Sequence, residues 1–151
     1  MARVNIDFPG QALFTYSLAV RITDINYGQH LAHDKLISML HEARAQFFLN
    51  FDLQESNVEG LGIILSDLAI SYQAESFFPD TLLVEMTLGD PSRCGCDMFY
   101  RVTKNNGEIV VATAKTGLVF FDYKVKKVAS MPMSFKRLLA LRNTNQPNNQ
   151  T

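Results

Sequence analysis

The chain has 151 residues, of which 47% are hydrophobic and 19% charged, so it is too apolar for a disordered protein. Fourteen Lys and Arg against fifteen Asp and Glu give a net charge of −1, which excludes a general nucleic-acid binder because such proteins need a basic excess. The sequence has no apolar run of about 20 residues to span a bilayer. Residues 1–7 also lack the apolar core of a secretory signal. We therefore expect one cytoplasmic domain over residues 1–151 that binds neither nucleic acid nor membrane.

A first strand is predicted by alternation of apolar and polar residues between residues 14 and 23. Its expected core face carries Phe14, Tyr16, Leu18, Val20 and Ile22. After a loop, a helix is predicted from about His33 to Phe51, a segment without Gly or Pro. Its apolar residues recur at i, i+4, i+7 and i+11 and so form one narrow stripe: Leu36, Leu40, Ala43 and Phe47.

Downstream of the helix the hydrophobic period returns to two, which indicates strands. We expect them at residues 62–72, 81–88, 94–103 and 108–122, running as a meander, then a short helix at 134–142 and a fraying polar tail at 143–151. One amphipathic helix against a curved antiparallel sheet of about five strands is an α+β arrangement. Long strands leave exposed sheet edges, and pairing of such edges between chains predicts a dimer.

The two cysteines, Cys94 and Cys96, lie two positions apart in a predicted strand, where closing a disulfide would strain the backbone. Without a neighbouring Cys or His pair they also make a poor zinc site. We interpret them as small core residues in a reducing compartment.

The loop before the helix, DINYGQHLAHD at residues 24–34, is the most unusual segment. Gly28 would let the backbone approach a ligand or adopt a positive φ, and the helix N-terminus behind it offers N–H groups to an oxyanion. Asn26 would orient a carbonyl or a water, and His30 or His33 would act as a base near neutral pH. The alternative is structural, with the polar residues capping a turn and the histidines packed or solvated.

A resemblance to a known family starts from the run between Val20 and Phe48, VRITDINYGQHLAHDKLISMLHEARAQFF. Its acidic residue at the strand end, D-x-N loop and helical E-A-R triplet resemble the signature of the 4-hydroxybenzoyl-CoA thioesterase family of hotdog-fold proteins. The likeness continues at residues 70–72, 112–122 and 127–132. It implies a long helix wrapped by an antiparallel sheet, and hydrolysis of an acyl-CoA or acyl-carrier-protein thioester by a homodimer or homotetramer. No cofactor or metal is expected, since CoA or phosphopantetheine is part of the substrate.

The resemblance also implies roles for single residues. Asn26 stands where many members carry a catalytic aspartate, Gly28 and His30 match the Gly-x-His positions of acyl thioesterases, and His33 matches a histidine of the short-chain acyl-CoA branch. Because an amide is not a useful base, we assign water activation to His30. Asn26 would then orient the water or the thioester oxygen, and backbone N–H groups near Gly28 and the helix start would hold the oxyanion.

Further candidate residues lie outside the loop signature or beside it, and most have a structural as well as a functional interpretation. Glu42 faces away from its own sheet on a helical wheel, so it is either a solvated carboxylate or a base for another protomer's loop. Asp67, central in an apolar strand, either faces water or belongs to a site. Tyr27 in the loop is a candidate for substrate binding. Lys124 and Lys126 are candidates too, because the family tends to place cations near the CoA phosphates, although such lysines are commonly just solvated.

Three alternatives remain open from the sequence. His30, His33 and Asp34 would form a metal site if they shared a helical face. Strand aromatics would line an acyl pocket rather than the core: Phe77, Phe78, Phe120 and Phe121. As to function, the same fold would suit an enoyl-thioester hydratase or dehydratase, or a non-catalytic acyl-thioester binder made plausible by the amide at position 26.

Overall fold

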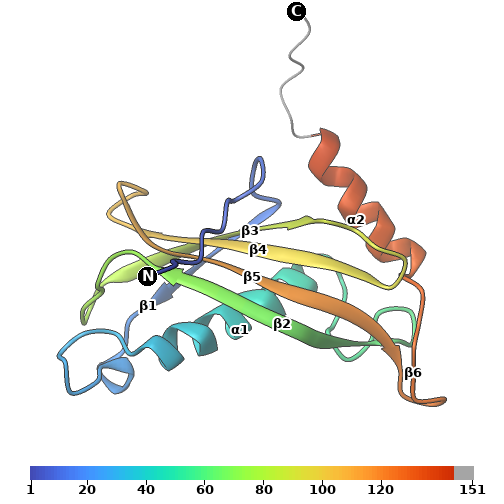
Figure 1. Cartoon of the computed structure of the whole chain (residues 1–151), viewed down its shortest axis with the longest axis horizontal. Helices are drawn as coiled ribbons and strands as arrows, with labels where there is room; N and C mark the ends of the chain where they lie inside the picture. Colours follow the sequence, from blue (N-terminus) through green and yellow to red (C-terminus); the bar gives the residue numbers. More distant parts are fainter. Residues whose placement is uncertain (145–151) are drawn as a thin grey trace, which may run out of the picture.

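The computed structural model describes residues 1–144 of the chain (Figure 1). The elements in chain order are β1 (Phe14–Ala19), the short 3-10 helix η1 (Ile22–Asp24), α1 (His33–Asn50), β2 (Gly62–Tyr72), β3 (Thr81–Gly89), β4 (Gly95–Lys104), β5 (Ile109–Asp122), β6 (Lys127–Val128) and α2 (Met133–Thr144). The strands form one antiparallel sheet in the order β1-β3-β4-β5-β2, with β6 paired to β5. This is the hotdog fold, so the expected α+β class is confirmed.

The strand order corrects the predicted meander in one respect. β3, β4 and β5 do follow one another through hairpins, but β2 pairs with β5 at one edge of the sheet, from Gly62 beside Phe121 to Tyr72 beside Ala112. The connection at residues 73–80 is too long for a tight hairpin and carries the chain across the end of the sheet to β3. A long connection does not force its two strands to be neighbours.

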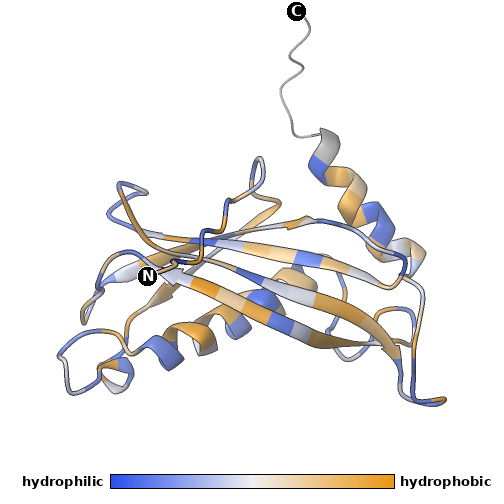
Figure 2. Ribbon diagram, in the orientation of Figure 1, coloured by the Kyte–Doolittle hydropathy of each residue, from blue (hydrophilic) through white to orange (hydrophobic). Residues whose placement is uncertain are grey.

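The core lies between α1 and the inner face of the sheet. The predicted stripe is buried throughout: Leu36, Leu40, Ala43 and Phe47. Figure 2 shows hydrophobic (orange) and hydrophilic (blue) residues alternating along α1, as an amphipathic helix requires. Phe47 also packs edge-on against Phe14, with ring centroids 6.0 Å apart, so the helix and the first strand share aromatic contacts.

A buried polar network fixes the middle of α1 to the sheet. The Arg44 guanidinium, from the E-A-R triplet, donates to Glu55 Oε1 at 2.8 Å and to the Tyr100 hydroxyl at 3.3 Å. Tyr100 Oη and Thr116 Oγ1 lie 2.8 Å apart, which links β4 to β5 through side chains. Because every charge in this network has a partner, burial of Arg44 is tolerated.

Two predicted boundaries differ from the structure by more than one residue. The first strand ends at Ala19 and Ile22 is 66% exposed, because Arg21 and Asp24 fold residues 22–24 into η1 and turn Ile22 out of the core. The closing helix includes residues 143 and 144, which the sequence assigned to the fraying tail; the rest of that tail, 145–151, lies outside the described residues. The short strand β6 had no counterpart in the prediction.

Of the two cysteines predicted as core residues, Cys96 lies in the core and Cys94 lies just before β4. Both are free thiols, Cys96 buried and Cys94 half-buried. Burial raises the pKa of the Cys96 thiol to about 12, so it stays protonated at neutral pH. None of the helices in residues 1–144 is long and apolar enough to cross a bilayer.

Replacing Phe47 with Ala tests the core. We expect a loss of about 3–5 kcal/mol in the free energy of unfolding, because the side chain is fully buried and its removal leaves a cavity. Chemical denaturation followed by circular dichroism measures it. The matched control is Leu49→Ala on the same helix, 53% exposed, for which less than about 1 kcal/mol is expected. Equal losses for the two variants would contradict this packing of α1.

Candidate active site

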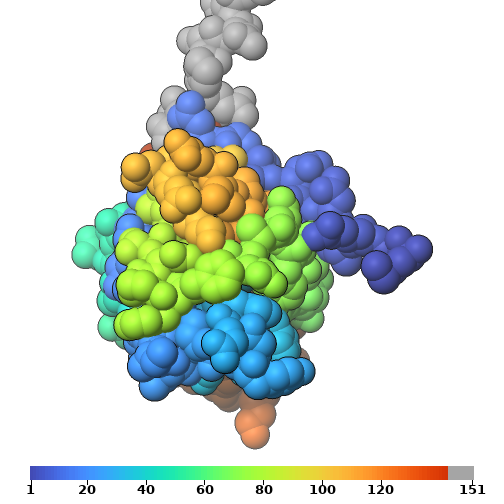
Figure 3. Space-filling model, turned by 90° about the vertical axis from the view of Figure 1, so that its left-hand side faces the viewer, coloured from blue at the N-terminus to red at the C-terminus, as the bar shows by residue number. Residues whose placement is uncertain are grey.

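The unusual loop lies at one end of the molecule, between η1 and the start of α1. Figure 3 looks onto this end, where the loop (blue) meets the β2–β3 connection (yellow-green). The two segments are joined by a backbone hydrogen bond, from Leu31 N–H to the Ser76 carbonyl at 2.8 Å. Residues far apart in the sequence therefore form one structure here.

Asp24 anchors the loop from inside. Its side chain is buried and accepts hydrogen bonds from Arg21, at 2.9 Å from the backbone N–H and 3.1 Å from Nη2. Its backbone carbonyl accepts from Ala32 N–H at 3.0 Å, which closes the loop next to the helix. Burial by itself raises the pKa of Asp24, but the hydrogen bonds and charge of Arg21 outweigh it and hold that pKa below its usual value.

Asn26 shapes the turn and keeps its amide N–H₂ available. Its Oδ1 accepts from Gly28 N–H at 3.0 Å, and its backbone carbonyl accepts from Gln29 N–H at 3.0 Å. The left-handed residue of the turn is Gln29 (φ 67°), so Gly28 is not there for a positive φ. Gly28 instead permits a close approach, since a Cβ at this position would lie 3.1 Å from His30 Nε2.

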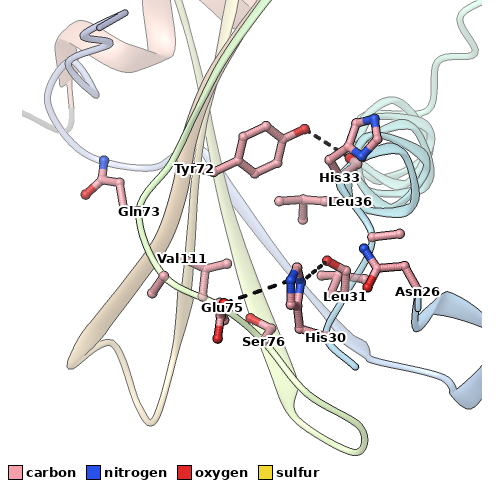
Figure 4. A pocket seen from close by; sticks show the side chains of 12 residues that line it. Asn26, His30, Leu31, His33, Leu36, Tyr72, Gln73, Glu75, Ser76 and Val111 are labelled. Carbon is pink, nitrogen blue, oxygen red and sulfur yellow. Dashed lines mark hydrogen bonds and ion pairs between the residues drawn. The ribbon is translucent and has the colours of Figure 1, made fainter. Parts of the chain in front are cut away.

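The His30 ring is fixed in one tautomer. Its Nδ1 lies 3.1 Å from the Leu31 carbonyl oxygen, which can only accept, so Nδ1 carries the hydrogen. Nε2 is then the basic nitrogen of the neutral ring. It lies 3.9 Å from Glu75 Oε1 of the β2–β3 connection, as Figure 4 shows.

These groups face a cavity of about 310 Å³. It is lined by Asn26, His30, Leu31, Ala32, His33, Leu36, Tyr72, Gln73, Ala74, Glu75, Ser76 and Val111. The walls are mainly apolar near α1 and polar toward the β2–β3 connection (Figure 4). The Ser76 hydroxyl is buried and finds no hydrogen-bond partner among the described residues.

The N-terminus of α1 opens beside the cavity. The cap residue is Ala32, whose side chain cannot bond the first N–H groups, and the first N–H accepted inside the helix is that of Leu36. The carbonyl of His33 accepts a hydrogen bond from the Tyr72 hydroxyl at 3.0 Å, which ties β2 to the helix start. The first turn thus presents N–H donors and the positive end of the helix dipole.

Two of the predicted carboxylates lie elsewhere. Glu42 is exposed on α1 and accepts from Gln46 Nε2 at 2.9 Å. Asp67 is exposed on β2 beside a bulge and accepts from Lys115 Nζ at 2.9 Å and from Gly117 N–H at 2.9 Å. The hydrogen bond from Lys115 holds the pKa of Asp67 below its usual value. The structure does not bring either carboxylate to the cavity of its own protomer.

The predicted substrate-binding residues are also outside the cavity. Tyr27 projects fully into solvent. Lys124 and Lys126 are exposed in the β5–β6 turn, which is at the opposite end of β2 because Gly62 pairs with Phe121.

Two alternatives left open by the sequence, an acyl pocket lined by strand aromatics and a metal site, find no support in the structure of residues 1–144. Phe120 belongs to the core, Phe121 is half-buried against Tyr123, and Phe77 and Phe78 are exposed, so none of the four lines the cavity. In residues 1–144 no three His, Cys, Asp or Glu side chains lie close enough together to hold a metal ion.

Among the cavity residues that sequence reasoning missed are Tyr72, Glu75 and Ser76. Tyr72 is the last residue of β2, and Glu75 and Ser76 lie in the connection that follows it. All three are far along the chain from the loop, and no spacing pattern connects them with His30. The only signal was the likeness of residues 70–72 to a family strand, which says nothing of the connection that follows.

Together, a long helix wrapped by an antiparallel sheet and a polar loop at the helix N-terminus define the class of hotdog thioesterase folds. The chain belongs to the thioesterase-like superfamily, whose family model matches residues 20–139. No curated protein is similar enough in sequence to count as a match.

Several solved structures share the fold. A 1,4-dihydroxy-2-naphthoyl-CoA thioesterase from Synechocystis aligns with TM-score 0.78 and 22% identity over 89% of this chain and 98% of that chain. A DHNA-CoA thioesterase from Staphylococcus aureus gives 0.76 and 17% identity over 88% and 95%. A hypothetical protein from Staphylococcus aureus, determined in complex with CoA, gives 0.80 and 18% identity over 97% and 93%. At these identities the similarity concerns the fold.

Replacing Asp24 with Asn tests the anchor of the loop. A carboxylate with a lowered pKa stabilises the fold above its unfolded pKa, about 3.9, and loses that contribution as the pH falls through the folded value. We therefore expect the variant to lose about 1–3 kcal/mol at neutral pH and progressively less in acid. Denaturation of both proteins at a series of pH values measures this. If the difference in free energy of unfolding between the two proteins grew as the pH fell, the stabilising role of the Asp24 charge would be contradicted.

Proposed function

We propose that the protein hydrolyses an acyl-CoA thioester to a free acid and CoA. The observation that carries this is His30, a histidine whose tautomer leaves Nε2 as the base at a cavity beside a helix N-terminus. A general base and oxyanion donors around an apolar pocket are what thioester hydrolysis requires. Membership of the thioesterase-like superfamily supports the same chemistry.

In the proposed reaction His30 Nε2 removes a proton from a water as that water attacks the thioester carbonyl carbon. The developing oxyanion accepts from N–H groups of the first turn of α1, while Gly28 N–H is engaged by Asn26 Oδ1. Asn26 retains its Nδ2 hydrogens, so it would donate to the thioester oxygen. In this reaction Gly28 does not donate to the oxyanion; it permits the close approach of His30. Asn26 donates a hydrogen bond to the thioester oxygen.

The effect of an amide at position 26 on the rate of hydrolysis follows from the sizes of the two contributions. A positioned base contributes about 10²–10⁴-fold, and each oxyanion donor about 3–4 kcal/mol. Since Asn26 still donates and His30 supplies a base, the site retains both contributions. A second candidate function, non-catalytic acyl-thioester binding, is favoured by Asn26 alone.

CoA is proposed as the thiol carrier in preference to an acyl carrier protein, because a relative of the same fold was determined in complex with CoA. The narrower 4-hydroxybenzoyl-CoA thioesterase subfamily and a cytoplasmic location are also part of the proposal. No cofactor or metal is needed, since every step uses side chains, backbone donors and water.

A homodimer paired along β2 completes the proposal. This edge strand bonds to β5 on one side only and exposes apolar side chains: Ile64, Leu65, Leu68 and Tyr72. Antiparallel pairing of two copies would place the start of one β2 beside the end of the other. The Lys124 and Lys126 turn of a second copy would then approach this cavity, where cations would meet the phosphates of CoA.

Replacing His30 with Ala should reduce the kcat for thioester hydrolysis by about 10²–10⁴-fold, because the base is lost. Thiol release from a panel of acyl-CoAs, detected with a disulfide reagent, measures it. Asn26→Ala should lower kcat as well. Unchanged hydrolysis in His30→Ala would remove the base from this residue, whereas tight binding of acyl-CoA without any turnover by the wild type would favour the binder.

Replacing Leu68 with Arg should dissociate the dimer, because it puts a charge into the apolar edge that the second copy covers. Light scattering after size exclusion should give twice 17.0 kDa for the wild type and one chain mass for the variant. Met133→Arg, at an exposed position of α2, is the control that should stay dimeric. A monomeric wild type would refute pairing along β2.

A further inference from the structure

We propose that Glu75 is a catalytic carboxylate of this site, one that shares the hydrolytic water with His30; this rests on the proposed thioesterase function. Glu75 comes from the β2–β3 connection, outside the loop where the family signature places its acid. The inference starts from the 3.9 Å between His30 Nε2 and Glu75 Oε1.

This separation is too long for a direct hydrogen bond and suits one water between the two atoms. The fixed tautomer leaves Nε2 as an acceptor, and the ionised carboxylate also only accepts. A water about 2.8 Å from both atoms would donate one hydrogen to each. Its lone pairs would then point away from both groups, toward the cavity, in the orientation that a nucleophile needs.

Hydrogen bonds to the backbone carbonyls of Glu75 and of the next residue fix this part of the connection. The position of the Glu75 carboxylate at the cavity is therefore defined by the fold. Lys104 Nζ donates to the Glu75 carbonyl at 2.7 Å and to Asp80 Oδ2 at 3.2 Å. The next carbonyl, that of Ser76, accepts from Leu31 N–H at 2.8 Å. These bonds use main-chain oxygens, which leaves both carboxylate oxygens of Glu75 for other partners.

Ser76 gives a second sign that the connection faces a ligand. Its hydroxyl lines the same cavity, is 2% exposed and has no partner among the described residues. A buried hydroxyl without a hydrogen bond costs free energy, and such groups in native structures call for an explanation. A substrate oxygen or a water in the cavity would supply the missing partner.

The charge on Glu75 compensates for the amide at position 26. When the water oxygen bonds to the thioester carbon, one water proton moves to His30 Nε2 and the carbonyl becomes an oxyanion. Glu75, still ionised, then stabilises the imidazolium across a short distance. Collapse of the oxyanion breaks the C–S bond, and the imidazolium proton passes to the departing sulfur. The products are a carboxylic acid and a thiol, and both enzyme groups return to their starting state.

The test is a double-mutant cycle with Glu75→Gln and His30→Ala, measured as thiol release from the best acyl-CoA substrate. Glu75→Gln keeps the shape of the side chain and the backbone bond to Lys104. We expect kcat to fall by about 10–100-fold with KM within about threefold, because the charge acts on the reacting water. In the His30→Ala background the same change should cost less than about twofold, since the two groups act on one water.

Glu108→Gln is the matched control, an exposed glutamate in the β4–β5 turn, and should retain wild-type kcat. Unfolding temperatures of all variants should agree closely with the wild type, because Glu75 is 66% exposed. Full activity of Glu75→Gln, or multiplicative losses in the double variant, would overturn the role of Glu75 while leaving the thioesterase intact. Absence of thiol release by the wild type would instead overturn the function itself.

Discussion

The backbone hydrogen bond from Leu31 N–H to the Ser76 carbonyl is the contact on which the candidate site depends. It joins the loop before α1 to the connection after β2, and it sets the His30 ring opposite Glu75. The cavity lies where both segments meet at the same end of the molecule (Figure 3). Together with the hydrogen bond from the Tyr72 hydroxyl to the His33 carbonyl, this bond holds the two walls of the cavity against each other.

The polar side chains of this region have different roles. Asp24 is buried and committed to Arg21 and to the backbone, so its charge stabilises the turn and is not available to a substrate. Asn26 carries no charge, and its side-chain oxygen accepts the hydrogen bond that holds Gly28. In residues 1–144 the one carboxylate that lines the cavity is that of Glu75, on the opposite wall. In the proposed reaction, stability and chemistry are thus carried by different side chains of the loop and the β2–β3 connection.

The sequence predicted local features well and long-range ones poorly. The buried stripe of α1 and the bounds of β2 to β5, to within one residue, followed from the hydrophobic period, which depends on neighbouring residues. The position of β2 at the sheet edge did not, because pairing with β5 is decided by the whole sheet. In the site, Asn26, His30 and His33 came from one continuous motif and do lie together. Glu75 and Ser76 had no such motif, since only the crossover of the chain brings them to His30.

The most direct test of the proposed site is a crystal structure with a non-hydrolysable ketone analogue of an acyl-CoA, in which a methylene group replaces the thioester sulfur and the carbonyl is kept. The ketone oxygen should lie near the first turn of α1 and Asn26, with an ordered water between His30 and Glu75. Binding of the acyl group on the outer face of the sheet, with the loop cavity empty, would contradict the proposed site.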